Sequence, residues 1–167
     1  KTRYNPQHIW QVLDRYGDFG KPMQITEITI PAYSTDPEDE AIQAQMLREL
    51  YRIWFASEHM ESIIYWNLID GYAAFAPQGD MTAGENYLYG GLLRFDGSPK
   101  PAFYALRDLI HKEWHTSASA ETADGTVSLR AFYGTYRLTV TANGRTTVQT
   151  VHFGKDGGAV RVVLDGE

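Results

Sequence analysis

The chain has 167 residues, of which 43% are hydrophobic and 22% charged, ordinary for a folded protein and enough for one domain or two small ones. Its formal net charge of −6 argues against a nucleic-acid partner, because such a partner selects a basic surface. The absence of cysteine excludes a disulfide framework and a thiolate metal site, and no apolar run approaches the ~20 residues of a membrane span.

The first part of the chain alternates between helical and strand patterns. Asn5 can cap a helix that Pro6 opens and Gly17 stops, and residues 22–28 then form a pattern typical of a buried strand. Asp36 is expected to cap a second, longer helix. Such an order predicts parallel strands joined by helical crossovers.

The same alternation continues with a second strand over residues 61–68, a Gly- and Tyr-rich loop over 70–93, and a third helix over 99–114. Two parallel strands cannot close a barrel or bury both of their faces. We therefore expect that the first part of a barrel is missing. Because the first residue is Lys1 and no signal peptide is visible, we also expect the chain to begin inside a longer precursor.

Beyond the third helix the pattern changes to that of a small antiparallel β module. Residues 117–125 are small and polar and predict a linker. From residue 126 onward the apolar residues recur at every second position, and Asn143-Gly144 is a strong hairpin signal. The pattern predicts about four strands in a β-sandwich-like module over residues 126–167, the last of them over 160–164.

Glu27 is the leading candidate for chemistry. It stands at the exit of the first predicted strand, and alternation would place it on one face with Met23 and Ile25. A carboxylate there is costly to bury, and in a (β/α) barrel the strand exits carry the active site. A lone Glu at a strand end is more often solvated or paired with an arginine, so Glu27 needs support from the rest of the chain.

That support is a resemblance to family-10 glycoside hydrolases, the xylanase family, in three successive stretches. Residues 21–28 (KPMQITEI) resemble the family's seventh strand, residues 63–70 (IIYWNLID) its eighth, and residues 92–106 its Leu-Leu-Phe-Asp turn and Lys-Pro-Ala-Tyr helix start. Thr29 replaces the family's Asp, Asn67 replaces a Gly, and Ala73-Ala74 replace a Ser-Trp pair. The resemblance covers about residues 5–114.

The resemblance implies an α/β fold in which residues 1–116 are the last two βα units of a (β/α)8 TIM barrel. It implies a retaining hydrolase of β-1,4-linked plant polysaccharide such as xylan, with Glu27 as the nucleophile and no metal or other cofactor. The implied substrate-binding residues are Trp66, Asp70, Tyr72, Phe75 and Tyr87.

The resemblance also defines what is lacking. The family's acid/base Glu lies on the fourth strand, in a motif that no segment of this chain matches. We therefore expect the isolated chain to be inactive, and its partners to be a polysaccharide or oligosaccharide and either the missing barrel segment or another copy of itself. Location outside the cytoplasm, whether secreted, periplasmic or on the cell surface, is inferred from the family.

The alternative is a non-catalytic carbohydrate-binding or structural module, carried by the β tail. Its aromatic residues Phe132, Tyr136 and Phe153 are more typical of a core than of a binding face. His111 and His115 stand four residues apart, but with no third ligand nearby in sequence they read as surface histidines.

Overall fold

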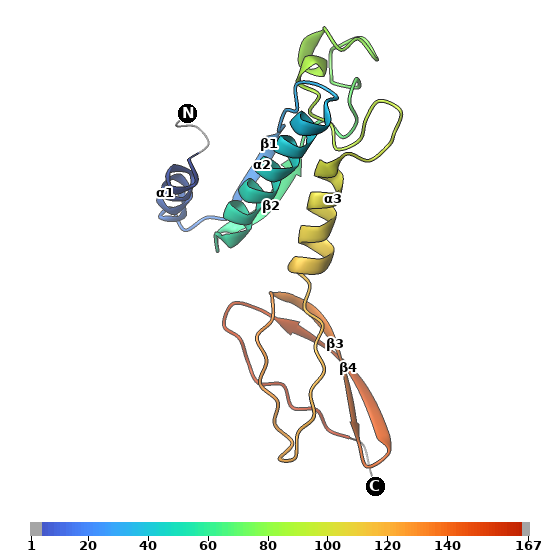
Figure 1. Cartoon of the computed structure of the whole chain (residues 1–167). Helices are drawn as coiled ribbons and strands as arrows, with labels where there is room; N and C mark the ends of the chain where they lie inside the picture. The colour runs from blue at the N-terminus through green and yellow to red at the C-terminus, as the bar shows by residue number, and fades with distance from the viewer. Residues whose placement is uncertain (1–4, 165–167) are drawn as a thin grey trace. The chain divides into compact units, whose positions relative to one another are not determined.

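The structure is a computed structural model in which residues 5–164 are described, and the chain divides into two compact units, Lys1–His111 and Lys112–Glu167 (Figure 1). The elements of the first unit follow one another as α1 (Pro6–Gly17), β1 (Met23–Ile28), α2 (Pro37–Ala56), β2 (Met60–Tyr65), the 3₁₀ helix η1 (Gly84–Leu88), α3 (Pro101–Asp108) and a π-helical turn (Leu109–Glu113) that continues past the unit boundary. The second unit contains β3 (Gly134–Ala142) and β4 (Arg145–Phe153).

The start of α1 follows the sequence prediction. The Asn5 side chain accepts hydrogen bonds from the backbone N–H groups of Gln7 and His8, at 2.9 and 3.4 Å, and Pro6 occupies the first helical position. These contacts satisfy two of the donors that the first turn of any helix leaves unpaired. The helix ends at Gly17, where the sequence predicts its end.

The pair β1–β2 is parallel, as the alternation of elements predicts. Ile25 pairs with Ile63, and Ile28 pairs with Tyr65. Between these two pairs the chain advances by three residues in β1 but by only two in β2. The extra residue shifts the register near the end of β1, and such a shift changes the direction in which the following side chains point. Glu27 lies within this shifted segment.

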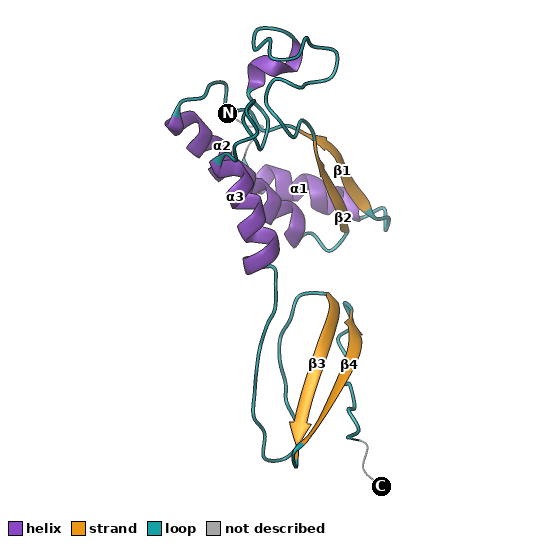
Figure 2. Ribbon diagram, turned by 90° about the vertical axis from the view of Figure 1, so that its right-hand side faces the viewer, coloured by secondary structure: helices purple, strands orange, loops and turns teal. Residues whose placement is uncertain are grey.

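The prediction that residues 22–28 form a buried strand is wrong in one respect: no residue of β1 or β2 is buried. Figure 2 shows α2 and α3 on one side of the two strands. The core of the unit lies instead between the helices and the loop after β2, and it includes Leu47, Leu50, Ala102, Leu106 and Leu109. A parallel sheet needs cover on both faces, which two strands and one helical layer do not supply.

The beginning of α2 differs from the expected cap. Asp36 precedes the helix, but its side chain makes no capping hydrogen bond. Ser34 organises the turn instead: its hydroxyl accepts from the Asp36 N–H at 3.0 Å and donates to the Asp39 carboxylate at 2.5 Å. The acidic residues Glu38, Asp39 and Glu40 favour the positive end of the helix, as the sequence predicts.

After β2, the predicted loop contains a short helix, and the predicted third helix is shorter than expected. The loop over residues 70–93 contains η1, and the third helix is eight α-helical residues followed by the π-helical turn rather than one helix over 99–114. The C-terminal part of β2 also ends at Tyr65 rather than residue 68.

The second unit contains a single β-hairpin among its described residues. β3 and β4 pair antiparallel in register, and Asn143 and Gly144 take the positive φ angles, 52° and 74°, that the predicted two-residue turn requires. The strands expected near Val127 to Ala131 and over 160–164 are not formed, so the β-sandwich-like module is not seen. Alternation makes a strand only where a neighbouring strand pairs with it. Val127 and Leu129 lie in a segment without such a neighbour, and their side chains are exposed. Residues 117–125, predicted as a linker, carry neither helix nor strand.

Candidate active site

Glu27 is exposed at the carboxyl end of β1, as the next-to-last residue of the strand. Met23 and Ile25 are half-buried, so the burial pattern does not continue to Glu27 as simple alternation predicts. The register shift between Ile25 and Ile28 explains the difference, since one extra residue changes the direction in which the following side chains point.

The exits of β1 and β2 are joined to one another directly. The Trp66 N–H donates to the Ile28 carbonyl at 2.8 Å, and the Thr29 hydroxyl donates to the Trp66 carbonyl at 3.3 Å. Because the strands are parallel, Glu27 and Trp66 lie at the same edge of the sheet. The sequence pattern extends the second strand to residue 68 and so places Trp66 inside it, whereas in the structure Trp66 directly follows the strand.

Trp66, Asn67 and Glu85 form a cluster at this edge. The Trp66 Nε1–H and the Asn67 Nδ2–H both donate to Glu85 Oε2, at 3.0 and 2.9 Å. Asn67 has a φ of 67°, a left-handed conformation that costs most non-glycine residues about 1–2 kcal/mol and that asparagine tolerates better than they do. This conformation gives a physical reason for the glycine that the resembled motif has at this position. A small recess beside the cluster is lined in part by Asn67, Glu85, Asn86 and Gly91.

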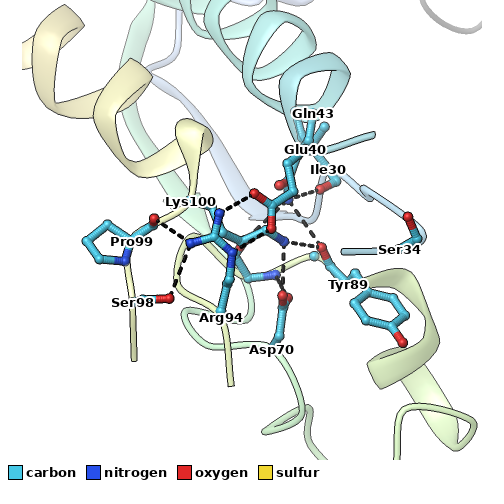
Figure 3. Close-up of polar contacts among 12 residues, drawn as sticks. Ile30, Ser34, Glu40, Gln43, Asp70, Tyr89, Arg94, Ser98, Pro99 and Lys100 are labelled. Carbon is cyan, nitrogen blue, oxygen red and sulfur yellow. Dashed lines mark hydrogen bonds and ion pairs between the residues drawn. The ribbon is translucent and has the colours of Figure 1, made fainter. Parts of the chain in front are cut away.

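Asp70 does not lie open to a ligand. Only 4% of its surface is exposed, Lys100 Nζ donates to its Oδ2 at 3.0 Å, and the Gly91 N–H donates to its Oδ1 at 2.7 Å (Figure 3). Lys100 is itself fully buried and also donates to the Tyr89 carbonyl at 2.8 Å. Both carboxylate oxygens are therefore engaged, and the geometry favours a structural role for Asp70 over the substrate-binding role that the resemblance implies.

A second polar group connects α2 to the same loop. Arg94 makes a bidentate pair with Glu40, at 2.8 and 2.5 Å, and also donates to the Pro99 carbonyl (Figure 3). The buried Gln43 amide donates to the Ile30 carbonyl at 2.7 Å and to the Gly91 carbonyl at 3.2 Å. These bonds tie the segment after β1 and the end of the loop to a single helix.

Tyr65, the last residue of β2, is hydrogen-bonded to the segment after β1 and to the end of the loop after β2. Its hydroxyl donates to the Gly90 carbonyl at 2.8 Å and accepts from the Ile30 N–H at 3.3 Å. Burial raises the pKa of Tyr65 to about 12, because the phenolate would lose its hydration there. The tyrosine therefore stays neutral and acts as a strut rather than as an acid or base.

The remaining aromatic candidates lie exposed on the loop after β2. The Tyr72 ring stacks on Phe95 with centroids 5.5 Å apart, and its hydroxyl accepts from Gln78 at 2.7 Å. Phe75 is fully exposed with a φ of 61°, and Tyr87 is half exposed in η1. No hydrogen bond or ring contact in the described part of the chain joins these three rings to Glu27. The structure thus brings Trp66 to the edge that carries Glu27, whereas Tyr72, Phe75 and Tyr87 project from the loop.

The hydrogen-bond partners of several residues in this region have no signal in the sequence. Glu85, Lys100 and Gln43 are separated in sequence from the groups they bind by between 11 and 48 positions. Asn67 offered one usable signal, since a small polar residue at a glycine position indicates a left-handed backbone. Within residues 5–164 there is no cluster of three or more His, Cys, Asp or Glu residues suited to a metal, and no helix long and apolar enough to cross a membrane.

Comparison with known proteins supports the fold. No protein-family profile matches the chain. The anti-sigma-I factor RsgI6 of Acetivibrio thermocellus is 28% identical over 135 residues, which cover 80% of this chain but 16% of that protein.

Crystal structures of xylanase 10B from Thermotoga petrophila RKU-1, in complex with xylobiose, and from Thermotoga maritima match with a TM-score of 0.55 and 22% sequence identity. Each match covers 65% of this chain and 32% or 33% of the xylanase. The chain thus has a xylanase-like fold over about two thirds of its length and spans about a third of the xylanases it matches.

Proposed function

We propose that the chain is the C-terminal part of a retaining glycoside hydrolase that acts on β-1,4-linked plant polysaccharide such as xylan. The observation that supports this most is the exposed carboxylate of Glu27 at the carboxyl edge of a parallel strand pair in a xylanase-like fold. In this proposal β1 and β2 are the seventh and eighth strands of a (β/α)8 barrel, and the hairpin unit is an appended module.

Glu27 acts in this proposal as the nucleophile. Its carboxylate attacks the anomeric carbon while a second carboxylic acid, about 5–5.5 Å away, gives its proton to the leaving oxygen. Water then releases the sugar from the glycosyl–enzyme ester, and the second group takes back a proton. That second group would lie in preceding barrel strands, outside the 167 residues, and the whole protein would work outside the cytoplasm.

Substrate contacts would come from the aromatic side chains at the same end of the sheet. Trp66 is the first candidate, with Tyr72, Phe75 and Tyr87 on the loop as further stacking surfaces for sugar rings. Asp70 would support the site from beneath through Lys100 and the Gly91 backbone.

The test is azide rescue of the Glu27→Ala variant, in the protein at its natural length. Without the carboxylate, turnover of an aryl β-xylobioside should fall to background. Azide can occupy the vacated space and attack the anomeric carbon, so added azide should restore turnover and yield a glycosyl azide of inverted configuration. Glu61→Ala is the matched control, because Glu61 is equally exposed but lies on β2 near its beginning. Unchanged turnover in Glu27→Ala, or loss without rescue or azide product, would remove Glu27 from the nucleophile role.

A second candidate function is carbohydrate binding without hydrolysis, in a regulatory protein. The similarity to a protein named as an anti-sigma factor favours it, because such a name describes regulation rather than catalysis. The two candidates differ in one measurement: a natural-length protein that binds xylo-oligosaccharides by calorimetry but never releases reducing ends supports the second.

A further inference from the structure

The cluster at the exit of β2 depends on one carboxylate. Glu85 Oε2 accepts both the Trp66 indole N–H and the Asn67 amide N–H, from residues that are adjacent in the chain. Two donors converging on one charged oxygen fix both side chains more firmly than a single neutral bond would. The indole N–H is the only polar group of the Trp66 ring, so this bond favours one orientation of the ring.

Glu85 is itself held in place by its neighbour in η1. Asn86 is buried; its side-chain oxygen accepts from the Ala73 N–H at 2.9 Å, and its amide donates to the carbonyls of Pro77 and Asp80, each at 3.0 Å. At the start of η1, Gly84 has a φ of 51°, and a Cβ there would lie 3.1 Å from the Ala76 Cβ. The short helix is therefore pinned to the loop segment beneath it, and Glu85 is carried by a fixed backbone.

The recess beside the cluster is lined by Glu85 and Asn67 along with backbone of the Gly90-Gly91 turn. Trp66 keeps 37% of its surface exposed while its N–H is engaged by Glu85. The ring is thus available for contact even though its orientation is fixed. This combination is what a stacking platform for a flat sugar ring needs.

We propose that Glu85 is a positioning residue of the sugar site, which holds the Trp66 ring in its binding orientation through Oε2 and stabilises the left-handed Asn67 beside it. The proposal deepens the glycoside-binding function and rests on it for the ligand, a β-1,4-linked xylo-oligosaccharide. Glu85 acts through Trp66 and does not itself bond to the sugar.

The first experiment needs no sugar. In ¹⁵N-labelled protein of natural length, the indole N–H resonance of Trp66, assigned with Trp66→Phe, should shift strongly in Glu85→Ala. It should stay near its original position in Glu85→Gln, because the glutamine oxygen can still accept both N–H groups. Glu61→Ala, which removes an exposed charge elsewhere in the unit, should leave the resonance unmoved.

The second experiment is a double-mutant cycle on binding of xylotetraose, measured by calorimetry. Glu85→Ala and Trp66→Phe should each weaken binding about tenfold, the size expected for one charge-assisted hydrogen bond. Phenylalanine keeps a ring to stack but has no N–H. If Glu85 acts through that N–H, the double variant should be only about tenfold weaker rather than about a hundredfold weaker.

The outcomes separate the two proposals. An unmoved Trp66 resonance in Glu85→Ala, additive losses in the cycle, or a Glu85→Ala variant that unfolds more easily yet binds xylotetraose as before would each overturn the positioning role. If the unaltered protein does not bind xylotetraose, the proposed function fails at this step, and the Trp66 resonance alone then decides whether Glu85 holds the ring.

Discussion

Lys100 and Asp70 form an ion pair inside the first unit, with side chains exposed by 0% and 3%. Taking two charges out of water is costly, and the pair is tolerable only because other groups complete its hydrogen bonds. The Gly91 N–H and the Tyr89 carbonyl do so here. The pair thereby fixes the end of the loop that begins at Trp66.

Removal of the Lys100 ammonium group should therefore lower the stability of the protein considerably. Lys100→Met keeps most of the side-chain volume but leaves the Asp70 carboxylate buried without a counter-charge, so we expect a loss of about 3–5 kcal/mol in the free energy of unfolding. Urea unfolding of the natural-length protein measures it. Lys21→Met, at an exposed lysine, should change stability by less than about 0.5 kcal/mol.

A third variant shows whether charge or packing is responsible. Asp70→Asn in the Lys100→Met background removes the unpaired charge and should recover part of the loss. No recovery would mean that the methionine fails to pack, and an undisturbed Lys100→Met protein would contradict the burial of the pair.

At the same scale, sequence reasoning located Glu27 and Trp66 but not what supports them. Hydrophobic patterning places Glu27 at a strand exit but extends the second strand past Trp66 to residue 68; parallel pairing still brings both residues to the same end of the sheet. Glu85 lies in a loop of glycines and tyrosines without periodicity, and its bonds depend on the left-handed Asn67. The resemblance implies substrate binding by Asp70, and the sequence does not show that Lys100, 30 positions later, occupies its carboxylate.

At the scale of elements, residue type alone predicts the wrong hydrogen-bonding residue at the start of α2. Asp36 has the composition and position of a cap, yet Ser34 makes the hydrogen bonds. We expect Ser34→Ala to weaken the first turn by about 1 kcal/mol, as loss of a capping side chain does. Hydrogen exchange at the amides of Glu40 to Ile42 should then be about fivefold faster.

Asp36→Ala is the matched control for this prediction. Its side chain makes no capping bond, so only its favourable charge near the helix start is lost, and the acceleration should be smaller. Equal acceleration in the two variants, or a larger one in Asp36→Ala, would return the capping role to Asp36.

The remaining elements fall into two groups: those determined by neighbouring residues and those that depend on residues far away in the sequence. The cap and stop of α1, the start of α2 and the Asn143-Gly144 turn arise from neighbouring residues, and their positions could be predicted. The burial of β1 and the strands expected over 127–131 and 160–164 could not, because a strand is stabilised by partners that its own sequence does not specify. Without these two strands, β3 and β4 form a two-stranded sheet. An alternating pattern alone does not show whether such a pair stands by itself or belongs to a larger sheet.

At the scale of the whole molecule, the first unit has a parallel sheet without the surroundings that such sheets have elsewhere. In the described part of the chain β1 and β2 pair only with each other, so each of them has one edge without a strand partner. Ile64 and Leu68 are exposed by 49% and 58% at and beyond the end of β2. If the chain is the last part of a barrel, this is the surface that preceding strands would cover.

The 167-residue polypeptide by itself should accordingly associate. At about 10 μM we expect dimers or larger species in sedimentation velocity and binding of an apolar dye, because an open apolar edge templates further strands. Ile64→Lys should reduce both signals, whereas Val148→Lys, at a similarly exposed apolar residue of the hairpin, should not. Extension of the polypeptide by the barrel segment that the proposed function places before it should abolish both signals. A compact monomer that binds no dye would contradict the incomplete-barrel proposal, and an equal effect of Val148→Lys would assign the association to the hairpin instead.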